Sequence, residues 1–369
     1  MNELSKISVV LPSLDPDEKL VAVIDGLLGY GFTDIILVND GSKQENLHYF
    51  EDAAAQHPEI HLLHQEVNRG KGAALKTAFA WFLENRPDAA GVVTVDGDNQ
   101  HHPEDTRACA QRMMETGKLV LGCRDFSLPH VPPRSRMGNR ITCGVFKFFV
   151  GMNISDTQTG LRAIPTRDIK TLMQVYGDRF EYETNMLLAM KDKGLPFDEV
   201  KIRTVYIEEN KSSHFRAVRD SWRIYKLILG HFFRYSISAI VSAVVDTGLY
   251  ALLSALLNTV LSGVGLTAVA VVVARAVSSL CNFFMNKKLV FQSNVQTGKA
   301  MLRYYMIAVP NMLLQLAFTQ GVYALFGIPD SATFLRSVIY VAVMCVLFVM
   351  TFVLQQRWVF ANKNARNED

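Results

Sequence analysis

The sequence predicts two domains of different class: a doubly wound, mostly parallel α/β sheet, followed by an all-α membrane domain of four helices. Short β-branched runs alternate with helical patterns over residues 7–124, which is typical of a parallel sheet with helices on both faces. Four apolar stretches follow residue 232, each close to the roughly 20 residues that a spanning helix needs. From that residue onward the chain holds four acidic and ten basic residues, whereas the first part is mildly acidic.

The elements of the first domain follow from apolar spacing and from turn residues. The helix over 17–30, for example, has Leu20, Val23 and Leu27 on one face and glycines after it. Pro12 is expected to end the first strand. Strands are expected at residues 7–11, 35–38, 60–63, 92–95 and 119–122, and helices at 17–30, 73–83, 103–116, from about 132 and from about 180.

The central strand ends in two carboxylates one residue apart, Asp96 and Asp98. Ligands of open α/β sheets bind beyond the carboxyl ends of the strands. Gly97 lets the backbone turn, so both carboxylates can place oxygen ligands on one hard divalent cation. Mg²⁺ or Mn²⁺ suits such ligands and commonly bridges them to phosphates. An isolated Asp-x-Asp also occurs in ordinary turns, so the site needs support from the rest of the chain.

Further polar residues follow the neighbouring strands: Asp15, Asp40, Lys71 and Arg124. Each of them alone is explained by a turn, a helix cap or a solvated charge. Together they would form one rim that holds a metal ion, cations, and a carboxylate able to accept from a base or a ribose. That combination fits a nucleoside diphosphate.

Five motifs, in this order, resemble those of the family 2 glycosyltransferases with a GT-A fold, and most closely the dolichyl- and polyprenyl-phosphate sugar synthases. The motifs are Val9–Pro12, Val38–Ser42, Asn68–Gly72, Asp96–His101 and Gly122–Arg124. The resemblance extends over roughly residues 7–215. It implies a metal-dependent inverting hexosyltransferase that moves one sugar from a nucleotide sugar to undecaprenyl or dolichyl phosphate, for cell-envelope glycosylation. UDP-glucose or a similar donor is expected, with GDP-mannose as the other choice.

The resemblance also assigns residues to the expected site. The metal ligands would be Asp96, Asp98 and Gln100. The nucleotide sugar would contact Pro12, Leu14, Asp15, Asp40, Lys71, Asp96 and Gly97, and the sugar pocket would contain Asp156, Gln158, Thr159 and Gly160. The acceptor phosphate would contact Arg124, Arg134, Arg136, Asn139, Lys211 and Ser213, and the catalytic residues would be Asp98, Arg124, Arg134 and Arg136. The second pKa of a phosphate monoester is near 6, so the acceptor needs no general base, and direct displacement would invert the anomeric centre.

The helix that begins near residue 132 is expected to face the acceptor and the membrane. Arg134 and Arg136 suit a phosphate, since a guanidinium binds one through two hydrogen bonds, and they equally suit anionic lipid headgroups. The apolar residues expected to lie on lipid are Val145, Phe146, Phe148 and Phe149. The segment Phe180–Glu183 begins a helix with carboxylates in its first turn, which the helix dipole favours.

Composition excludes several other classes of protein. The net charge is only +3 and aromatic residues do not alternate with basic ones, so no nucleic-acid groove is indicated. The five cysteines form no CxxC pair, which argues against zinc and disulfides. The neighbours His101 and His102 point opposite ways on an extended chain, so a loop role before Pro103 is expected. With no signal peptide at its start, the first domain is expected in the cytoplasm.

The membrane domain is expected to contain four spans: Tyr235–Leu257, Leu266–Phe284, Tyr304–Phe326 and Phe334–Leu354. A basic helix with aromatic residues, 215–233, would lie in the membrane interface before them. Lysine and arginine gather between spans two and three and after span four, so both termini are expected in the cytoplasm. The expected domains are 1–211 (catalytic), 212–233 (juxtamembrane), 234–361 (membrane) and 362–369 (tail).

The membrane half contains a repeat. Arg234-Tyr235 recurs as Arg303-Tyr304, and the segment 288–291 recurs as 357–360, both at an offset of 69 residues (303 − 234 and 360 − 291). Two helical hairpins in parallel orientation are therefore expected, and this half resembles the GtrA-like four-span domain. Self-association into a homo-oligomer stays open.

Two questions about this half stay open. Asp246 and Arg275 fall inside spans, either as a structural pair or as groups that handle lipid phosphate, since a charge at the bilayer centre costs about 2.5–3.5 kcal/mol. The membrane half could also translocate the lipid-linked sugar. A processive polysaccharide synthase is disfavoured, because Gln355–Trp358 lacks the spacing of the Gln-x-x-Arg-Trp motif and follows the last span.

Overall fold

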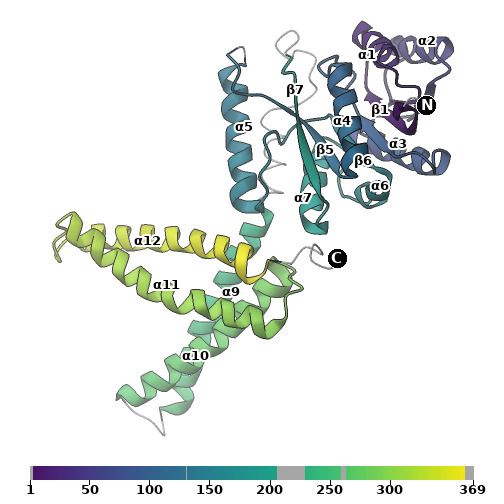
Figure 1. Cartoon of the computed structure of the whole chain (residues 1–369). Coiled ribbons are helices and arrows are strands. Elements are labelled where there is room, and N and C mark those ends of the chain that lie inside the picture. Colours follow the sequence, from purple (N-terminus) through teal and green to yellow (C-terminus); the bar gives the residue numbers. More distant parts are fainter. Residues whose placement is uncertain (1–2, 130, 206–228, 259–262, 362–369) are drawn as a thin grey trace. The chain divides into compact units, whose positions relative to one another are not determined.

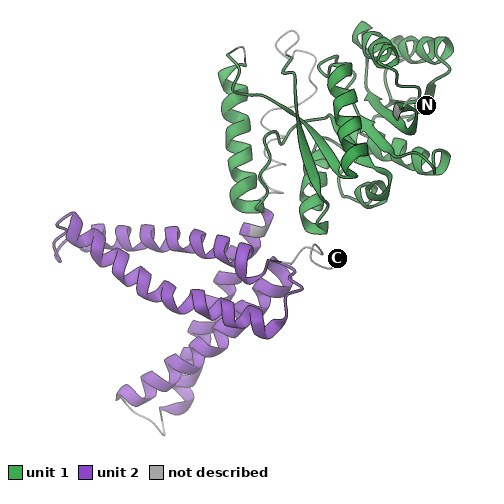
Figure 2. Cartoon of the chain, in the orientation of Figure 1, with its two compact units in different colours: residues 1–228 green, residues 229–369 purple. Residues whose placement is uncertain are grey.

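The computed structural model describes residues 3–129, 131–205, 229–258 and 263–361, and it divides into two units (Figure 2). Unit 1 is Met1–Ile228 and unit 2 is Leu229–Asp369. The division falls inside the expected juxtamembrane segment 212–233. Lys211, Ser213 and most of the expected interfacial helix lie outside the described residues. The domain borders at 211 and 234 stay predictions.

Unit 1 is built on one seven-stranded sheet with the strand order β3-β2-β1-β4-β6-β5-β7 (Figure 1). Of these seven strands only β6 runs antiparallel to its neighbours β4 and β5. The mostly parallel sheet predicted from the sequence is therefore confirmed. The strands are β1 (Ile7–Ser13), β2 (Ile35–Asn39), β3 (Ile60–His64), β4 (Gly91–Thr94), β5 (Leu119–Arg124), β6 (Arg162–Pro165) and β7 (Phe197–Ile202).

Helices cover both faces of the sheet, and two apolar cores form against them. On β1, Val9 packs with α1, α2 and α4, whereas its neighbour Val10 packs with α3, α6 and α7, as alternation along a buried strand requires. The helices are α1 (Glu18–Gly29), α2 (His48–Gln56), α3 (Lys71–Asn85), α4 (Pro103–Thr116), α5 (Pro133–Val145), α6 (Thr166–Met173) and α7 (Glu181–Lys193). The turns Glu3–Lys6 and Gln44–Asn46 are 3₁₀-helical, and the π-helical turn Phe146–Val150 extends α5.

Pro12 does not end β1, contrary to the prediction. The strand continues to Ser13, and Pro12 pairs with Val38 of β2. The N–H of Val9 points to β2, so a donor at position 12 would point to the β4 side, where the pairing of β1 with β4 has already ended at Val10. The missing proline N–H therefore costs no ladder bond.

Unit 2 consists of two helical hairpins (Figure 1). The first is α9 (Gly230–Leu257) with α10 (Gly263–Met285), and the second is α11 (Thr297–Leu325) with α12 (Thr333–Leu354). Within the described residues, three helices are long and apolar enough to cross a membrane: Phe232–Leu257, Val264–Val290 and Thr333–Val359. The helix α11 is long enough but more polar, so the fourth span stays a prediction.

The two hairpins repeat each other in detail where they meet. The π-helical turns Asn286–Val290 and Gln355–Val359 end α10 and α12 at the same 69-residue offset. Asn286 Nδ2 donates to its own counterpart, Gln355 Oε1 (3.0 Å), and Phe291 stacks on its counterpart Phe360 with ring centroids 5.2 Å apart. Each of these contacts therefore joins a residue of the first hairpin to the equivalent residue of the second. The repeat read from the sequence is confirmed as a structural one.

Candidate active site

The polar residues after the parallel strands do converge at one edge of the sheet in unit 1. The loop after β4 carries Asp96, and the first residue of α3, Lys71, reaches it. Asp40, after β2, holds the loop in front of α3. The segment before β6 passes directly over Asp96 at Gly160. This is the edge where a doubly wound sheet binds its ligand.

Three charged side chains of this edge form a cluster around Lys71. Its Nζ lies 2.6 Å from Asp96 Oδ1 and 2.9 Å from Glu183 Oε1 of α7. Burial alone would lower the pKa of Lys71, but the two carboxylates raise it well above its ordinary value. Burial alone would raise the pKa of Asp96, but the charge of Lys71 outweighs it and the pKa falls to about 2. Both groups are therefore charged at neutral pH.

The turn after Asp96 places a second carboxylate beside the first. Asn99 adopts a left-handed conformation (φ 60°), and the N–H of Gln100 donates to Asp98 Oδ1 (3.1 Å). Burial, and then the charge of Asp96, raise the pKa of Asp98 above its ordinary value. Two carboxylates that oppose each other's ionisation are stabilised together by a cation. Asp96, Asp98 and Gln100, the residues predicted to bind metal, are therefore close together.

The two histidines of this turn support the backbone, as expected for a loop before Pro103. His101 Nδ1 accepts from the N–H of Asp96 (3.3 Å), and His102 Nδ1 caps α4 by accepting from the N–H of Glu104 (3.2 Å). Burial lowers the pKa of His101, so that the ring is neutral and able to accept.

Gly160 is required by close approach. A Cβ at this position would lie 2.9 Å from Asp96 Cγ and still closer to Oδ2. The carbonyl of Gly160 accepts from Thr94 Oγ1 (2.7 Å), which fixes the segment to β4. The predicted sugar-pocket segment therefore lies in contact with the predicted metal ligand.

Asp40 is buried and holds the glycine-rich loop before α3. Its carboxylate accepts from the N–H of Arg69 (2.9 Å) and, through both oxygens, from the N–H of Gly70 (3.1 and 2.9 Å). Gly70 has φ +102°, and a Cβ there would collide with Arg179 and Asp178. Asp40 thus positions the loop that presents Lys71, and the predicted contact between Asp40 and a base stays a prediction.

The loop after β1 is tied to the loop after β2. Asp15 adopts φ 48°, its N–H donates to Ser42 Oγ (2.8 Å), and its Oδ1 accepts from the N–H of Lys43 (2.8 Å). Pro12 and Leu14 lie half-buried beside it. These three residues stay predicted nucleotide contacts.

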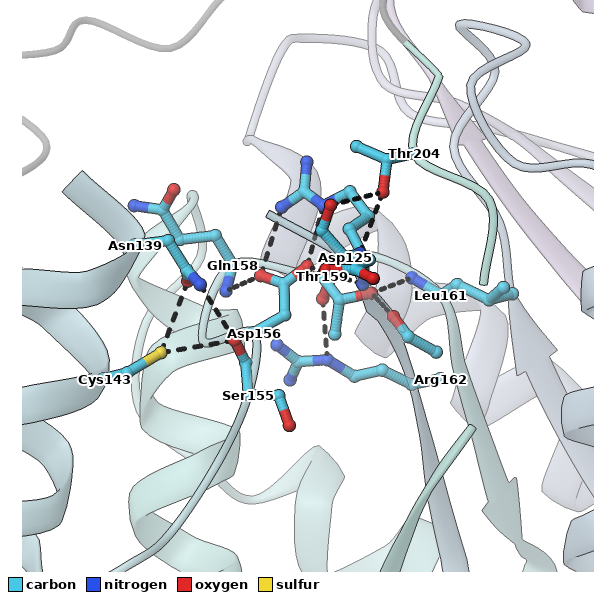
Figure 3. Close-up of polar contacts among 12 residues, drawn as sticks. Asp125, Asn139, Cys143, Ser155, Asp156, Gln158, Thr159, Leu161, Arg162 and Thr204 are labelled. Carbon is cyan, nitrogen blue, oxygen red and sulfur yellow. Dashed lines mark hydrogen bonds and ion pairs between the residues drawn. The ribbon is translucent and has the colours of Figure 1, made fainter. Parts of the chain in front are cut away.

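Arg124, at the end of β5, is held by a fully buried carboxylate. Its Nε lies 2.7 Å from Asp156 Oδ2 and its Nη2 3.1 Å from Oδ1, a pairing through two parallel bonds. The N–H of Gln158 also donates to Asp156 (3.0 Å), as Figure 3 shows, and Thr159 Oγ1 donates to the carbonyl of Gly122 (2.5 Å). Asp156 and Thr159 are buried, so they support the pocket from beneath. A direct contact of either with a sugar stays a prediction.

Helix α5 carries the remaining acceptor candidates. Arg136 donates to the carbonyls of Phe126 (3.0 Å) and Leu128 (2.8 Å), and Arg134 is exposed. Asn139 Nδ2 donates to the carbonyl of Ser155 (2.8 Å), which joins α5 to the segment that carries Asp156 (Figure 3). Some of the hydrogen-bond donors of Arg136 are therefore already used by the loop before α5.

The predicted lipid face of α5 is wrong in most of its residues. Phe146 is fully buried, and Val145 and Phe149 pack against the same core, so that only Phe148 is exposed. The exposed apolar residues nearer the start of α5 are Met137 (62 %) and Ile141 (48 %). The π-helical turn after α5 rotates the far end of the helix into the core, which helical spacing alone does not predict.

Two residues of the site were given no individual contact from the sequence. Glu183 was explained as a helix-terminal carboxylate, but it shares Lys71 with Asp96. Arg162 is 1 % exposed, and its Nε donates to the carbonyl of Thr159 (3.1 Å), as Figure 3 shows. Its Nη1 donates to the carbonyl of Glu183 (2.8 Å). An arginine in an apolar strand is the one sequence signal that could have drawn attention to it.

Family models match both halves of the chain. Residues 8–172 match Glycosyl transferase family 2, and residues 234–360 match the transmembrane domain of GtrA/DPMS. The chain carries both domains. The resemblance read from the motifs is confirmed, and this glycosyltransferase is an integral membrane protein.

Similar proteins include two that act on lipid phosphates by name. UDP-N-acetylglucosamine–dolichyl-phosphate N-acetylglucosaminyltransferase of Methanococcus voltae is 26 % identical over 60 % of this chain and 95 % of that protein. Undecaprenyl-phosphate mannosyltransferase of Micrococcus luteus is 24 % identical over 56 % of this chain and 86 % of that protein. Among solved structures, glucosyl-3-phosphoglycerate synthase from Mycobacterium tuberculosis with Mn²⁺, UDP and glucosyl-3-phosphoglycerate is 17 % identical over 60 % of this chain and 77 % of that chain, with a TM-score of 0.43.

Proposed function

We propose that this glycosyltransferase moves one sugar from a nucleotide sugar to the phosphate of a polyprenyl lipid, with inversion. The observation that carries the proposal is the charged edge of the sheet. Lys71, Asp96 and Glu183 lie at one place on it, and Arg124 is fixed at the end of another strand. A diphosphate donor and a phosphate acceptor both need such groups. The membrane unit in the same chain, and the names of the two relatives above, favour a lipid acceptor.

The residues after β4 fit a divalent cation. Asp96 and Asp98 are neighbouring carboxylates, and Gln100 adds an amide oxygen in the same turn. An all-oxygen donor set that leaves positions for water and phosphate suits Mg²⁺ or Mn²⁺. When bound, the ion would neutralise the diphosphate leaving group.

The side chains of this chain would bind and orient the two substrates. Lys71 lies within reach of both carboxylates and can move from Asp96 to a diphosphate oxygen while Glu183 keeps its position. Arg124, oriented by the buried Asp156, and the exposed Arg134 would receive the acceptor phosphate. That phosphate is largely dianionic above its second pKa of about 6, so it attacks without a general base. A single in-line displacement inverts the anomeric carbon.

The proposal also includes the identity of the sugar donor and the orientation of the chain in the membrane. We take UDP-glucose as the first donor to test and GDP-mannose as the second. Both termini and unit 1 would lie in the cytoplasm, because the basic residues of unit 2 gather in the loop between its hairpins and after α12.

The test is a donor screen with the full-length chain in detergent or nanodiscs. Radiolabelled UDP-glucose, UDP-N-acetylglucosamine and GDP-mannose are each incubated with undecaprenyl phosphate and Mg²⁺ or Mn²⁺. One donor should give an organic-extractable, mild-acid-labile product. Asp98→Ala should reduce it by about 10²-fold or more, as loss of transition-state charge stabilisation does. The exposed Asp88→Ala serves as the control.

No lipid product from any donor would contradict the proposed function. A product that Asp98→Ala makes at the wild-type rate with a chelator present would contradict the metal site.

A further inference from the structure

A charged pair lies inside the first hairpin of unit 2. Arg275 Nη2 of α10 is 3.3 Å from Asp246 Oδ2 of α9, and Ser278 Oγ donates to Asp246 Oδ1 (2.9 Å). The Asp246 side chain is 23 % exposed, but the Arg275 side chain is 74 % exposed. The aspartate is therefore held by both neighbours, whereas most of the Arg275 side chain is exposed.

The depth of Arg275 makes this exposure costly. In the apolar helix Val264–Val290, it lies eleven residues from one end (275 − 264) and fifteen from the other (290 − 275). At a rise of about 1.5 Å per residue that is about 16 and 22 Å, in a hydrocarbon core about 30 Å thick. Arginine reaches the interface by snorkelling only near helix ends. A polar partner at this depth is therefore expected.

The internal repeat shows that a hairpin does not need this pair. The 69-residue offset maps Asp246 to Gln315 and Arg275 to Met344 (315 − 246 and 344 − 275), both uncharged. Features that both hairpins share, such as the π-helical turns and the Asn286–Gln355 contact, have a structural role in unit 2. The charges occur in one hairpin only. They therefore point to a ligand.

We propose that Arg275, oriented by Asp246, binds the phosphate of an isoprenoid lipid within the membrane unit. This rests on the proposed function, which supplies that lipid. A guanidinium on a mostly exposed side chain suits a phosphate, which it can bind through two parallel bonds. A second copy of the chain fits less well. Asp246 is the only acidic residue in the sequence of α9, α10, α11 and α12, and it is already engaged.

The test uses the full-length chain in nanodiscs with a polyprenyl phosphate that carries a diazirine near its phosphate. Photolabelled peptides are mapped in the wild type and in D246Q/R275M, which gives the first hairpin the neutral residues of the second. The wild type should be labelled in α9 or α10, and the double variant at least tenfold less. Arg275→Lys should fall between them, and Gln315→Ala should label as the wild type does.

Comparison ligands identify the chemistry. The phosphate-free polyprenol and phosphatidylglycerol should label α9 and α10 at least tenfold less, and millimolar inorganic phosphate should not compete. Equal labelling by polyprenol or phosphatidylglycerol, competition by inorganic phosphate, wild-type labels confined to other segments, or undiminished labelling of D246Q/R275M would each overturn the inference.

Sugar transfer by the same preparations separates the two proposals. Active wild-type protein without phosphate-selective labelling of α9 or α10 refutes this inference alone. Selective labelling without transfer from any donor refutes the proposed function and supports the lipid-phosphate site.

Discussion

Lys71 would compete with the proposed metal ion for Asp96. Its Nζ is 2.6 Å from Asp96 Oδ1 and 2.9 Å from Glu183 Oε1. In the proposed mechanism the lysine balances these two half-buried carboxylates until a cation and a diphosphate bind. Breaking such a pair by removal of one partner leaves uncompensated charge.

Lys71→Met should strengthen the binding of Mn²⁺ in the absence of nucleotide, because a competing cation is removed from Asp96. We expect about a tenfold lower Kd, which is about 1.4 kcal/mol, by titration with electron paramagnetic resonance detection. The variant should bind the nucleotide more weakly. Lys76→Met is the control. It removes another lysine of α3, which pairs with Asp178, and it should leave the affinities for Mn²⁺ and for the nucleotide unchanged. Unchanged or weaker Mn²⁺ binding in Lys71→Met would contradict this view of the site.

Gly160→Ala should reduce turnover by about 10²-fold without loss of the fold, because the new methyl group displaces the carboxylate of Asp96. The measurement is kcat with saturating donor, with thermal unfolding as the check on folding. Gly29→Ala is the control, since a Cβ at Gly29 meets nothing within 4 Å. Full activity of Gly160→Ala would show that the position of Asp96 is not critical.

Asp168→Asn should stabilise unit 1 at neutral pH. Burial raises the pKa of Asp168, which Arg167 lowers only in part, and Oδ2 has no hydrogen-bond partner among the residues that the structure describes. A raised carboxyl pKa means that the folded state takes up a proton more readily than the unfolded chain, so ionised Asp168 opposes folding above its folded pKa. The variant should gain about 1 kcal/mol at pH 7–8, and the gain should shrink as the pH falls towards 4. A gain that is independent of pH would contradict this.

At the scale of elements, the sequence predicted the five apolar strands β1 to β5 and missed β6 and β7. The buried strands β1, β2 and β4 are apolar runs with polar ends, and their positions were predicted to within two residues. Strand β7 carries three charged residues at the sheet edge, and β6 is four residues long with a buried arginine. Neither has the apolar run that single-sequence reasoning depends on.

Site residues that are close together in the sequence could be predicted, whereas pairs that are far apart in the sequence could not. Asp96 and Asp98 lie in one turn of the chain, and their spacing alone suggested a shared cation, which stays a prediction. Glu183 reaches Lys71 from 112 residues away in the sequence (183 − 71), and Arg124 meets Asp156 only because β5 and the segment before β6 lie side by side. Such pairs follow from topology, which the sequence pattern leaves undetermined.

The contact between Asn286 and Gln355 joins the two hairpins, and its loss should weaken unit 2. Asn286→Leu removes a donor from the buried Gln355 oxygen, so we expect about 1 kcal/mol of destabilisation, measured by thermal unfolding in detergent. Gln320→Leu, at an exposed position on α11, is the control. If both variants unfold alike, the contact does not hold the hairpins together.

For the whole molecule, the order of the two domains was predictable because their compositions differ sharply. A parallel sheet and a set of membrane helices leave distinct apolar patterns, and both were confirmed. The number of spans is less well determined by composition, since α11 is more polar than the other three helices and bonds to α12 through a polar residue. Asn311 there lies 3.3 Å from Thr351.

The central claim is that the carboxylates after β4 hold the donor diphosphate through a cation while Lys71 approaches it. An experimental structure of the full chain with Mn²⁺ and a nucleoside diphosphate tests this most directly. We expect the anomalous signal of manganese at Asp96 and Asp98, and we expect Lys71 Nζ to have moved from Asp96 to a phosphate oxygen. Manganese bound away from both aspartates, or a nucleotide outside this edge of the sheet, would contradict it.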